Sequence, residues 1–278
     1  MQTAVIALVL VSALMHASWN AFLHLSGDRV SLLGAMSLPY LVLGALGALL
    51  LPLPASASWP YIVLSSAIQG AYCFALVRAY RHGEFGQVYP IARGLSPLVI
   101  CVAALVFAGE TLHPLALGGI VLVSFGIVSL AFKRDLRFSA ESVPYALLTG
   151  LLIAGYSVVD GIGVRKSGNA FSYVSWAYLL WNVPQLALLH RLRGGWSGLL
   201  TSRDETLRGV LAGTLALAAY TLVVFAFRYL PIAMVSALRE LSSIFAVLIS
   251  WLFLREKLTA QRIAACALVT LGTVLIRI

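Results

Sequence analysis

The chain is a succession of long apolar stretches, each closed by a short polar or proline-containing break. Crossing the hydrocarbon core of a bilayer takes about 20 residues of helix, which matches the length of these stretches. Lipid offers no partner for backbone N–H and C=O groups, so the spans are expected to be helices. Their length, and the lack of strict alternation of apolar and polar residues, argues against a closed strand barrel. We therefore predict an all-α integral membrane protein.

Hydropathy and breaking residues divide the chain into ten predicted transmembrane helices. They are Thr3–His24, Leu32–Leu51, Trp59–Tyr80, Phe85–Ala108, Pro114–Phe132, Pro144–Val164, Phe171–Leu189, Leu207–Tyr229, Pro231–Leu254 and Thr259–Ile276. The longest predicted loop is Arg191–Thr206. Because 61% of the residues are hydrophobic and only 10% are charged, no room is left for a separate soluble domain.

The net charge of +9 comes from basic residues that flank the apolar stretches, where they anchor a membrane protein. Nucleic acid is therefore not an expected partner. Loops that follow odd-numbered spans carry 13 Lys and Arg residues, against four on the other side. The positive-inside rule places the richer side in the cytoplasm and hence both termini outside.

The second half of the chain repeats the first at a shift of 146 positions. The shift superimposes an arginine within a predicted span, a loop glutamate and a helix glycine on residues of the same kind. These pairs are Arg93 and Arg239, Glu110 and Glu256, and Gly126 and Gly272. We predict two five-helix repeats, residues 1–137 and 138–278, within a single transporter unit. Since five is odd, the second copy enters the membrane from the opposite side, as in inverted-repeat transporters.

Two related loop motifs carry a resemblance to a known family. They are Gly109-Glu110-Thr111-Leu112 and Arg255-Glu256-Lys257-Leu258-Thr259, followed by Gly126 and Gly272. The chain thereby resembles the EamA family of the drug/metabolite transporter superfamily. The resemblance implies a ten-helix carrier of amino acids or other small metabolites, and many relatives are drawn with both termini inside. His16-Ala17-Ser18-Trp19-Asn20 and Tyr89-Pro90-Ile91-Ala92-Arg93-Gly94 also resemble a branch associated with phosphonate utilisation.

Arg93 and Arg239 are the leading candidates for substrate binding, because a charge inside a span is costly unless it meets a partner, water or substrate. As repeat mates they are expected to face one central cavity. Two guanidinium groups suit a carboxylate or phosphonate, which each can bind through two parallel hydrogen bonds. In the alternative interpretation each arginine pairs with a neighbouring carboxylate or helix end and holds the gates together.

Two acidic residues inside spans are further candidates. Glu240 is adjacent to Arg239 and therefore points about 100° away around the helix, so it is not an obvious partner for that arginine. It is a candidate for a substrate ammonium or a coupling proton. Asp160 is the second acidic candidate, although Arg165 and Lys166 are close enough in sequence for a salt bridge at the membrane edge.

Polar and aromatic side chains within the spans are expected to line the substrate path. The i, i+3 and i, i+4 spacings place His16 on one face with Trp19 and Asn20, and Gln69 with Tyr72. For the aromatic residues the alternative is packing or an interfacial belt. The other members of this candidate set are Tyr89, Tyr156, Trp181, Asn182 and Tyr220.

The sequence has no catalytic motif, phosphate-binding glycine loop, metal-ligand spacing or cofactor motif, so we predict a protein that is not an enzyme. We expect a multi-pass secondary transporter of the bacterial inner membrane, working by alternating access as a monomer or weak homodimer. Its substrate is expected to be a small anionic or zwitterionic metabolite, such as an amino acid or aminophosphonate, with protons as the candidate coupling ion. The alternatives are a multidrug exporter of lipophilic cations and a membrane protein that does not transport.

Overall fold

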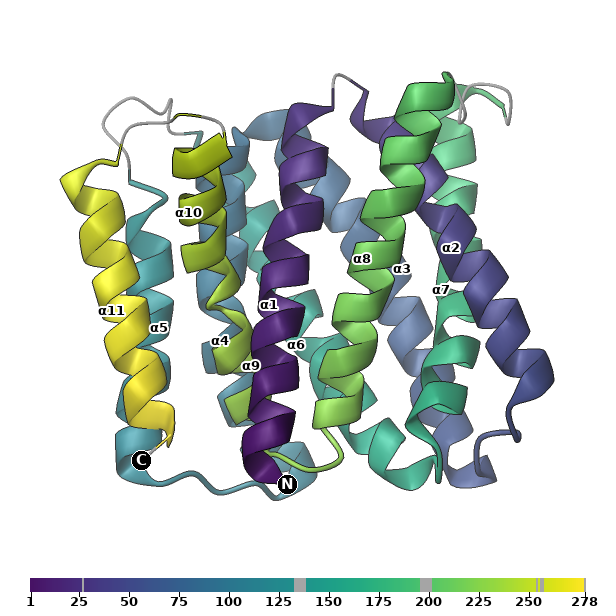
Figure 1. The fold of residues 1–278 in the computed structure, drawn as a ribbon, viewed down its shortest axis with the longest axis horizontal. Coiled ribbons are helices and arrows are strands. Elements are labelled where there is room, and N and C mark those ends of the chain that lie inside the picture. The colour runs from purple at the N-terminus through teal and green to yellow at the C-terminus, as the bar shows by residue number, and fades with distance from the viewer. Residues whose placement is uncertain (27, 133–138, 196–201, 254, 256–257, 278) are drawn as a thin grey trace. The chain divides into compact units, whose positions relative to one another are not determined.

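The computed structural model describes residues 1–26, 28–132, 139–195, 202–253, 255 and 258–277 (Figure 1). Within these ranges the chain forms α-helices and one short 3-10 helix, η1 (Ser56–Ser58), and no strand. The α-helices are α1 (Gln2–Leu25), α2 (Arg29–Leu50), α3 (Trp59–His82), α4 (Phe85–Ala108), α5 (Pro114–Ser129), α6 (Ser142–Lys166), α7 (Ala170–Arg193), α8 (Arg203–Ala226), α9 (Ile232–Arg239), α10 (Ser242–Phe253) and α11 (Ala260–Arg277).

Ten spans account for these helices, because α9 and α10 follow one another within the predicted ninth span, Pro231–Leu254. The ten-helix, all-α membrane fold is thus confirmed. Among the described residues, seven segments are long and apolar enough to cross a membrane, and α5 and the apolar part of α11 are shorter. The predicted loop Arg191–Thr206 is shorter than expected, because α7 continues to Arg193 and α8 begins at Arg203.

The helices form two compact units that each draw on both halves of the chain. Unit 1 consists of residues 1–70 and 160–229, and unit 2 of residues 71–159 and 230–278. The division falls inside α3 and α6, so each of these helices contributes one end to each unit. A boundary between the units therefore does not follow the boundary between the predicted sequence repeats.

Unit 1 is held together by close helix contacts at glycines. A β-carbon added at Gly213 on α8 would lie 2.5 Å from the Met36 carbonyl oxygen and 2.9 Å from the ring of Pro39 on α2. On the other pair of helices, a β-carbon added at Gly70 on α3 would lie 2.9 Å from Pro184 on α7. Small residues at such contacts let helices approach closely, which drives their association in lipid. Each of these two glycine-against-proline contacts thus joins a helix of the first half of the chain to a helix of the second half.

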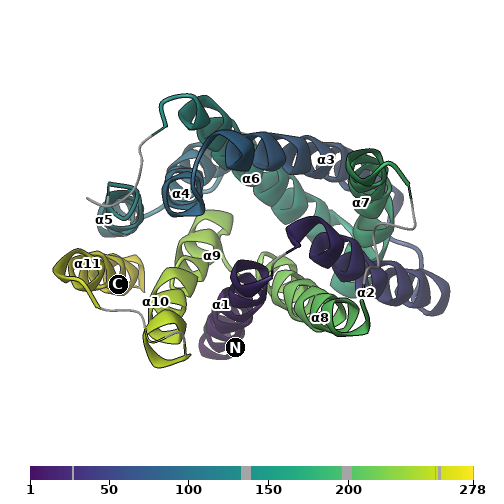
Figure 2. The ribbon, with the colours of Figure 1, turned by 90° about the horizontal axis from the view of Figure 1, so that it is seen from above.

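Unit 2 contains the pair α5 and α11, which lie side by side in both views (Figures 1 and 2). A β-carbon at Gly119 would lie 2.5 Å from the Gly272 carbonyl oxygen, and one at Gly272 would lie 2.5 Å from the Gly119 carbonyl oxygen. Farther along α5, Gly126 approaches Ala265, so the two helices run antiparallel. The shift of 146 positions converts the Gly119–Gly272 contact into the Ala265–Gly126 contact. These contacts have the two-fold symmetry that an inverted repeat requires.

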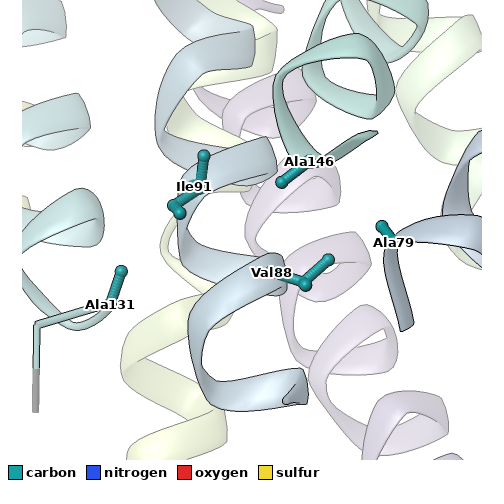
Figure 3. Packing of buried hydrophobic residues seen from close by; sticks show 5 residues of the cluster. All are labelled: Ala79, Val88, Ile91, Ala131 and Ala146. Atoms are coloured by element: carbon teal, nitrogen blue, oxygen red, sulfur yellow. The ribbon is translucent and has the colours of Figure 1, made fainter. Parts of the chain in front are cut away.

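A small apolar core in unit 2 fixes the first turns of α4 (Figure 3). Val88 and Ile91 of α4 lie between Ala79 at the end of α3, Ala146 of α6 and Ala131, which follows α5. All five side chains are buried. Close packing at these positions holds the N-terminal part of α4 in place, and Arg93 lies on the next turn of this helix.

Glu110, in the loop after α4, binds the N-terminus of α9. Its two carboxylate oxygens accept from the Ile232 amide at 3.0 and 2.7 Å. The first amides of a helix have no partner within the helix, and a carboxylate there also balances the positive end of the helix dipole. Glu110 therefore has a structural role as a cap for α9. Its predicted repeat mate, Glu256, lies outside the described residues.

We expect Gly119→Leu to destabilise the protein by about 1–3 kcal/mol, because the added side chain would be forced against α11. Gly118→Leu is the matched control, since a β-carbon at Gly118 meets nothing within 4 Å. Thermal unfolding of the detergent-solubilised protein measures both. Equal losses at the two glycines would contradict the close helix contact.

Glu110→Ala should lower stability by about 1 kcal/mol, the usual cost of removing a side-chain cap. Glu84→Ala provides the comparison, because Glu84 occupies the N-cap of α4 without making a side-chain cap hydrogen bond. Chemical unfolding in detergent tests the difference. If Glu84→Ala were as damaging as Glu110→Ala, the capping role would be wrong.

Candidate functional site

The candidate residues fall into two groups, one in each unit. The group in unit 2 contains the charged pair of arginines, Glu240 and three tyrosines; its members are Tyr72, Tyr89, Arg93, Tyr156, Arg239 and Glu240. The group in unit 1 contains one carboxylate among aromatic and amide side chains; its members are His16, Trp19, Asn20, Gln69, Asp160, Trp181, Asn182 and Tyr220. Each group is described within its own unit.

The break between α9 and α10 places three polar residues inside unit 2. The amides of Glu240, Leu241 and Ser243 bond to carbonyls three residues back instead of four, at 3.1, 3.1 and 2.9 Å. The chain tightens there into a 3-10 turn, a feature that often marks a functional site within a helix. In transporters, the ends of such interrupted helices direct backbone dipoles at bound ions and substrates. Arg239 ends α9 at this point, and Glu240 follows it.

Glu240 pairs with Arg93 of α4. Arg93 Nη2 lies 2.8 Å from Glu240 Oε1, and both residues are buried, with exposed fractions of 4% and 1%. Sequence analysis weighed Glu240 only against its neighbour Arg239 and did not anticipate this pair. Arg93 therefore does pair with a carboxylate, as the alternative interpretation has it. The second carboxylate oxygen of Glu240 has no hydrogen-bond partner among the described residues.

Arg239 has no carboxylate of its own. It is 5% exposed, no ion pair of this residue occurs within the described part of the chain, and its Nε atom has no hydrogen-bond partner there. The positive charge of Arg239 does interact electrostatically with Glu240 and with Tyr89. Two guanidinium groups and one carboxylate give this buried cluster a net charge of +1. An anion would neutralise it.

Glycines position Arg93 by letting α5 and α6 approach α4. A β-carbon at Gly94 would lie 2.4 Å from Val128 and 2.9 Å from the Ser124 carbonyl oxygen of α5. One at Gly150 of α6 would lie 2.7 Å from the Ala92 carbonyl oxygen. The backbone on both sides of Arg93 is thus held by neighbouring helices.

A proline further shapes the helix at this point. Pro97 has no N–H to donate to the Arg93 carbonyl, four residues back. The Ser96 hydroxyl donates to that carbonyl instead, at 3.1 Å.

Three tyrosines lie near the Arg93 guanidinium, and one of them, Tyr89, faces it. Its central carbon lies 6.0 Å from the centre of the Tyr89 ring, one turn away on α4. The rings of Tyr72 and Tyr156 contact each other edge to face at 5.8 Å, and both tyrosines act electrostatically on Arg93. The unit 2 residues selected from the sequence therefore form one cluster, with an ion pair, an additional cation and aromatic walls.

Asp160 is the centre of the group in unit 1. Its Oδ1 accepts from the Tyr173 hydroxyl at 2.8 Å and its Oδ2 from the Tyr220 hydroxyl at 2.5 Å. The considered salt bridge to Arg165 and Lys166 is not formed. Arg165 donates to the Phe227 carbonyl at 2.7 Å, and Lys166 donates to the Tyr61 hydroxyl at 2.9 Å.

Aromatic rings lie next to this carboxylate. Trp181 contacts Tyr220 at 6.2 Å and Tyr40 at 5.2 Å between ring centres, and Tyr40 contacts Tyr178 at 5.1 Å. Asn182 donates to the Tyr178 carbonyl at 2.7 Å, which leaves its side-chain oxygen buried without a partner among the described residues. Unit 1 thus has an aromatic group around one buried acid.

The remaining candidates make local contacts. Trp19 donates to His16 Nδ1 at 3.2 Å, and Asn20 donates to the His16 carbonyl at 2.8 Å, so these three share a face of α1 as expected. Gln69 is buried on α3, in unit 1. Tyr72, its expected neighbour on the same face, is assigned to unit 2.

Sequence analysis missed Tyr173 and Ser65, the partners of Asp160 on α7 and α3. No spacing in the sequence links a tyrosine on one helix to an acid on another, so only the fold reveals them. Within the described residues, no group of three or more His, Cys, Asp or Glu side chains could hold a metal ion.

The Arg93–Glu240 pair should dominate the stability of unit 2. Glu240→Gln is expected to cost about 3–5 kcal/mol, because it leaves two buried cations without an anion. Arg93→Gln should cost less, since Arg239 then balances Glu240. A double-mutant cycle compares the free energies of unfolding of the two single variants and the double variant with that of the parent protein. Glu141→Gln is the control, because Glu141 is 83% exposed. Equal costs for the two single variants would contradict this charge balance.

Comparison with known proteins agrees with the architecture. Residues 141–278 match the model of the EamA-like transporter family. A solved crystal structure, described only as that of a protein, is similar to the chain with a TM-score of 0.75 and 20% sequence identity. The likeness covers 99% of this chain and 95% of that chain, and it shows the fold alone. No curated protein matches the sequence.

The family model covers the second five-helix half, including the interrupted helix that carries Arg239 and Glu240. The members of this family are membrane transporters, which agrees with the long apolar helices of the chain. The chain belongs to the EamA-like transporter family and is a multi-pass membrane transporter of the drug/metabolite type.

Proposed function

We propose that the chain is a secondary transporter of small anionic or zwitterionic metabolites and that Arg239 binds the anionic group. The observation that carries the proposal is the net charge of +1 in the buried cluster of Arg93, Arg239 and Glu240. Burying an uncompensated charge is costly, so a bound carboxylate or phosphonate would stabilise the loaded protein. Amino acids and aminophosphonates are the leading substrate classes.

Glu240 supplies the second half of a zwitterion site. One of its carboxylate oxygens pairs with Arg93, and the other has no hydrogen-bond partner in the described structure. A substrate whose anionic group pairs with Arg239 could place its ammonium at this free oxygen. Tyr72, Tyr89 and Tyr156 supply aromatic walls with polar tips. The 3-10 turn at Glu240 supports a role for this segment in alternating access between the two sides of the membrane.

The proposal includes the internal organisation and the location of the carrier. We assign residues 1–137 and 138–278 to two inverted copies within one transporter unit, supported by the reciprocal contacts between α5 and α11. The bacterial inner membrane is the proposed location, because bundles of apolar helices are suited to it. A monomer or weak homodimer is the proposed state.

A second candidate function, export of lipophilic cations, is favoured by one observation. Asp160 is a buried carboxylate without a cationic partner in the described structure, and Tyr220, which donates to it, has the ring of Trp181 packed against its own ring. Aromatic faces attract organic cations. The charge of the transported compound separates this function from the leading one.

Counterflow in proteoliposomes tests the leading function, with labelled L-alanine, labelled 2-aminoethylphosphonate and tetraphenylphosphonium as probes. Arg239→Gln should raise the half-saturating concentration of the anionic or zwitterionic probe by about 10- to 100-fold, the value of a hydrogen bond to a charged group. Arg239→Lys should give a half-saturating concentration between those of the parent protein and Arg239→Gln, because lysine keeps the charge but lacks the planar guanidinium group.

Arg228→Gln is the matched control, since Arg228 is an exposed arginine that bonds to the Gly168 carbonyl. Transport of tetraphenylphosphonium alone, with Arg239→Gln behaving as the parent protein, would establish the cation exporter instead.

A further inference from the structure

Asp160 is enclosed by hydroxyl groups from three other helices. Tyr173 of α7 and Tyr220 of α8 donate to its two oxygens, and Ser65 of α3 lies within hydrogen-bonding reach. Asp160 is 1% exposed, and Ser65 and Tyr173 are also buried. A carboxylate inside a span with this many dedicated partners is a built site rather than a packing residue.

No cation neutralises this carboxylate within the described part of unit 1. The two basic residues on its own helix are directed elsewhere, Arg165 to the Phe227 carbonyl and Lys166 to Tyr61. Among the described residues, the other titratable groups near the site are tyrosines: Tyr61 acts on Tyr173, and Asp160 acts on Tyr178. Ionised Asp160 therefore leaves a buried charge of −1, and one bound proton removes it.

The partners of Asp160 suit a proton that comes and goes. A hydroxyl both donates and accepts, so it can stabilise either form of the carboxyl group. When Asp160 is ionised, Tyr173 and Tyr220 donate to it. When a proton adds to one carboxyl oxygen, that O–H becomes a donor and the facing tyrosine hydroxyl rotates to accept it. The change requires no side-chain movement beyond hydroxyl rotation.

Gly163 keeps Tyr173 in position. It lies about one turn after Asp160 on α6, and a β-carbon there would lie 2.5 Å from the Tyr173 hydroxyl oxygen and 2.6 Å from Tyr61. Only a residue without a side chain lets the tyrosine hydroxyl pass close to α6 and reach the carboxylate. The glycine is thus part of the site.

We propose that Asp160, with Tyr173 and Tyr220, binds the coupling proton of the carrier. The coupling role rests on the proposed function, whereas proton binding does not. A proton explains the geometry better than a metal ion, because the hydroxyl groups lie at hydrogen-bonding distance from both carboxylate oxygens. A bound proton also neutralises the buried charge of Asp160 without requiring a cationic substrate.

The first test detects the proton directly and needs no substrate. Infrared difference spectra of the purified protein are recorded during a pH titration, and the carboxylic acid C=O band of a buried group is followed. The band should be present at low pH, disappear as pH rises, and be absent in Asp160→Asn. Tyr220→Phe removes a donor to the ionised form, so its band should persist to higher pH. Glu141→Gln, at an exposed carboxylate, should leave the band unchanged.

The second test measures coupling in proteoliposomes with the membrane potential clamped. An imposed pH gradient should drive accumulation of L-alanine or 2-aminoethylphosphonate by the parent protein but not by Asp160→Asn. A cooperative thermal unfolding transition of Asp160→Asn shows that the variant is folded, and Glu141→Gln, at an exposed carboxylate, should accumulate the probe as the parent protein does. Tyr220→Phe should shift the pH dependence of accumulation in the same direction as the infrared band.

The outcomes separate the two proposals. A titrating band assigned to Asp160 supports the proton site even if neither probe is transported, in which case only the proposed substrate class fails. A band that Asp160→Asn leaves intact overturns the proton site, whatever the transport result. Loss of tetraphenylphosphonium counterflow in Asp160→Asn, without a titrating band, assigns the carboxylate to a cationic substrate and also overturns it.

Discussion

The cost of an uncompensated charge in lipid is the constraint on which unit 2 depends. Two buried arginines and one buried glutamate occur together there, and within the described residues Arg93–Glu240 is the ion pair that they form. The surrounding structure keeps these groups in place: α5 and α6 approach α4 at Gly94 and Gly150, and the small apolar core fixes the first turns of α4. An interaction this costly to maintain is expected where a substrate of opposite charge completes the balance.

The proposed repeat accounts for the difference between Arg93, which is paired, and Arg239, which has no ion pair within the described residues. The shift of 146 positions that superimposes Arg93 on Arg239 also superimposes Gly94 on Glu240. In the first copy the residue after the arginine has no side chain, which lets α4 lie close to α5. In the second copy the same position carries a carboxylate, which pairs with the arginine of the first copy instead of its neighbour. A carboxylate at only one of the two equivalent positions therefore pairs one arginine and leaves its mate without an anion among the described residues.

The sequence predicted the spans well because long apolar runs have only one stable backbone form in lipid. Phe85–Ala108 was predicted with the bounds that α4 has. The break between α9 and α10 was not predicted, since neither proline nor glycine interrupts the chain at Arg239-Glu240-Leu241. Pro90 and Pro97, the strongest breaking signals in the mate helix, lie within a continuous α4. The candidate residues were found because charges inside spans are rare, but Tyr173 and the partner of Glu240 depend on contacts between helices far apart in sequence.

The two units carry opposite uncompensated charges. In unit 2 the cluster of Arg93, Arg239 and Glu240 has a net charge of +1, and in unit 1 the ionised form of Asp160 has a charge of −1. A bound anion neutralises the first and a bound proton neutralises the second, so each ligand removes one buried charge. On the proposed mechanism, the fully loaded protein is the form with the smallest electrostatic penalty within each unit. Coupling the movements of substrate and proton requires in addition that each of them shift the same conformational equilibrium of the carrier.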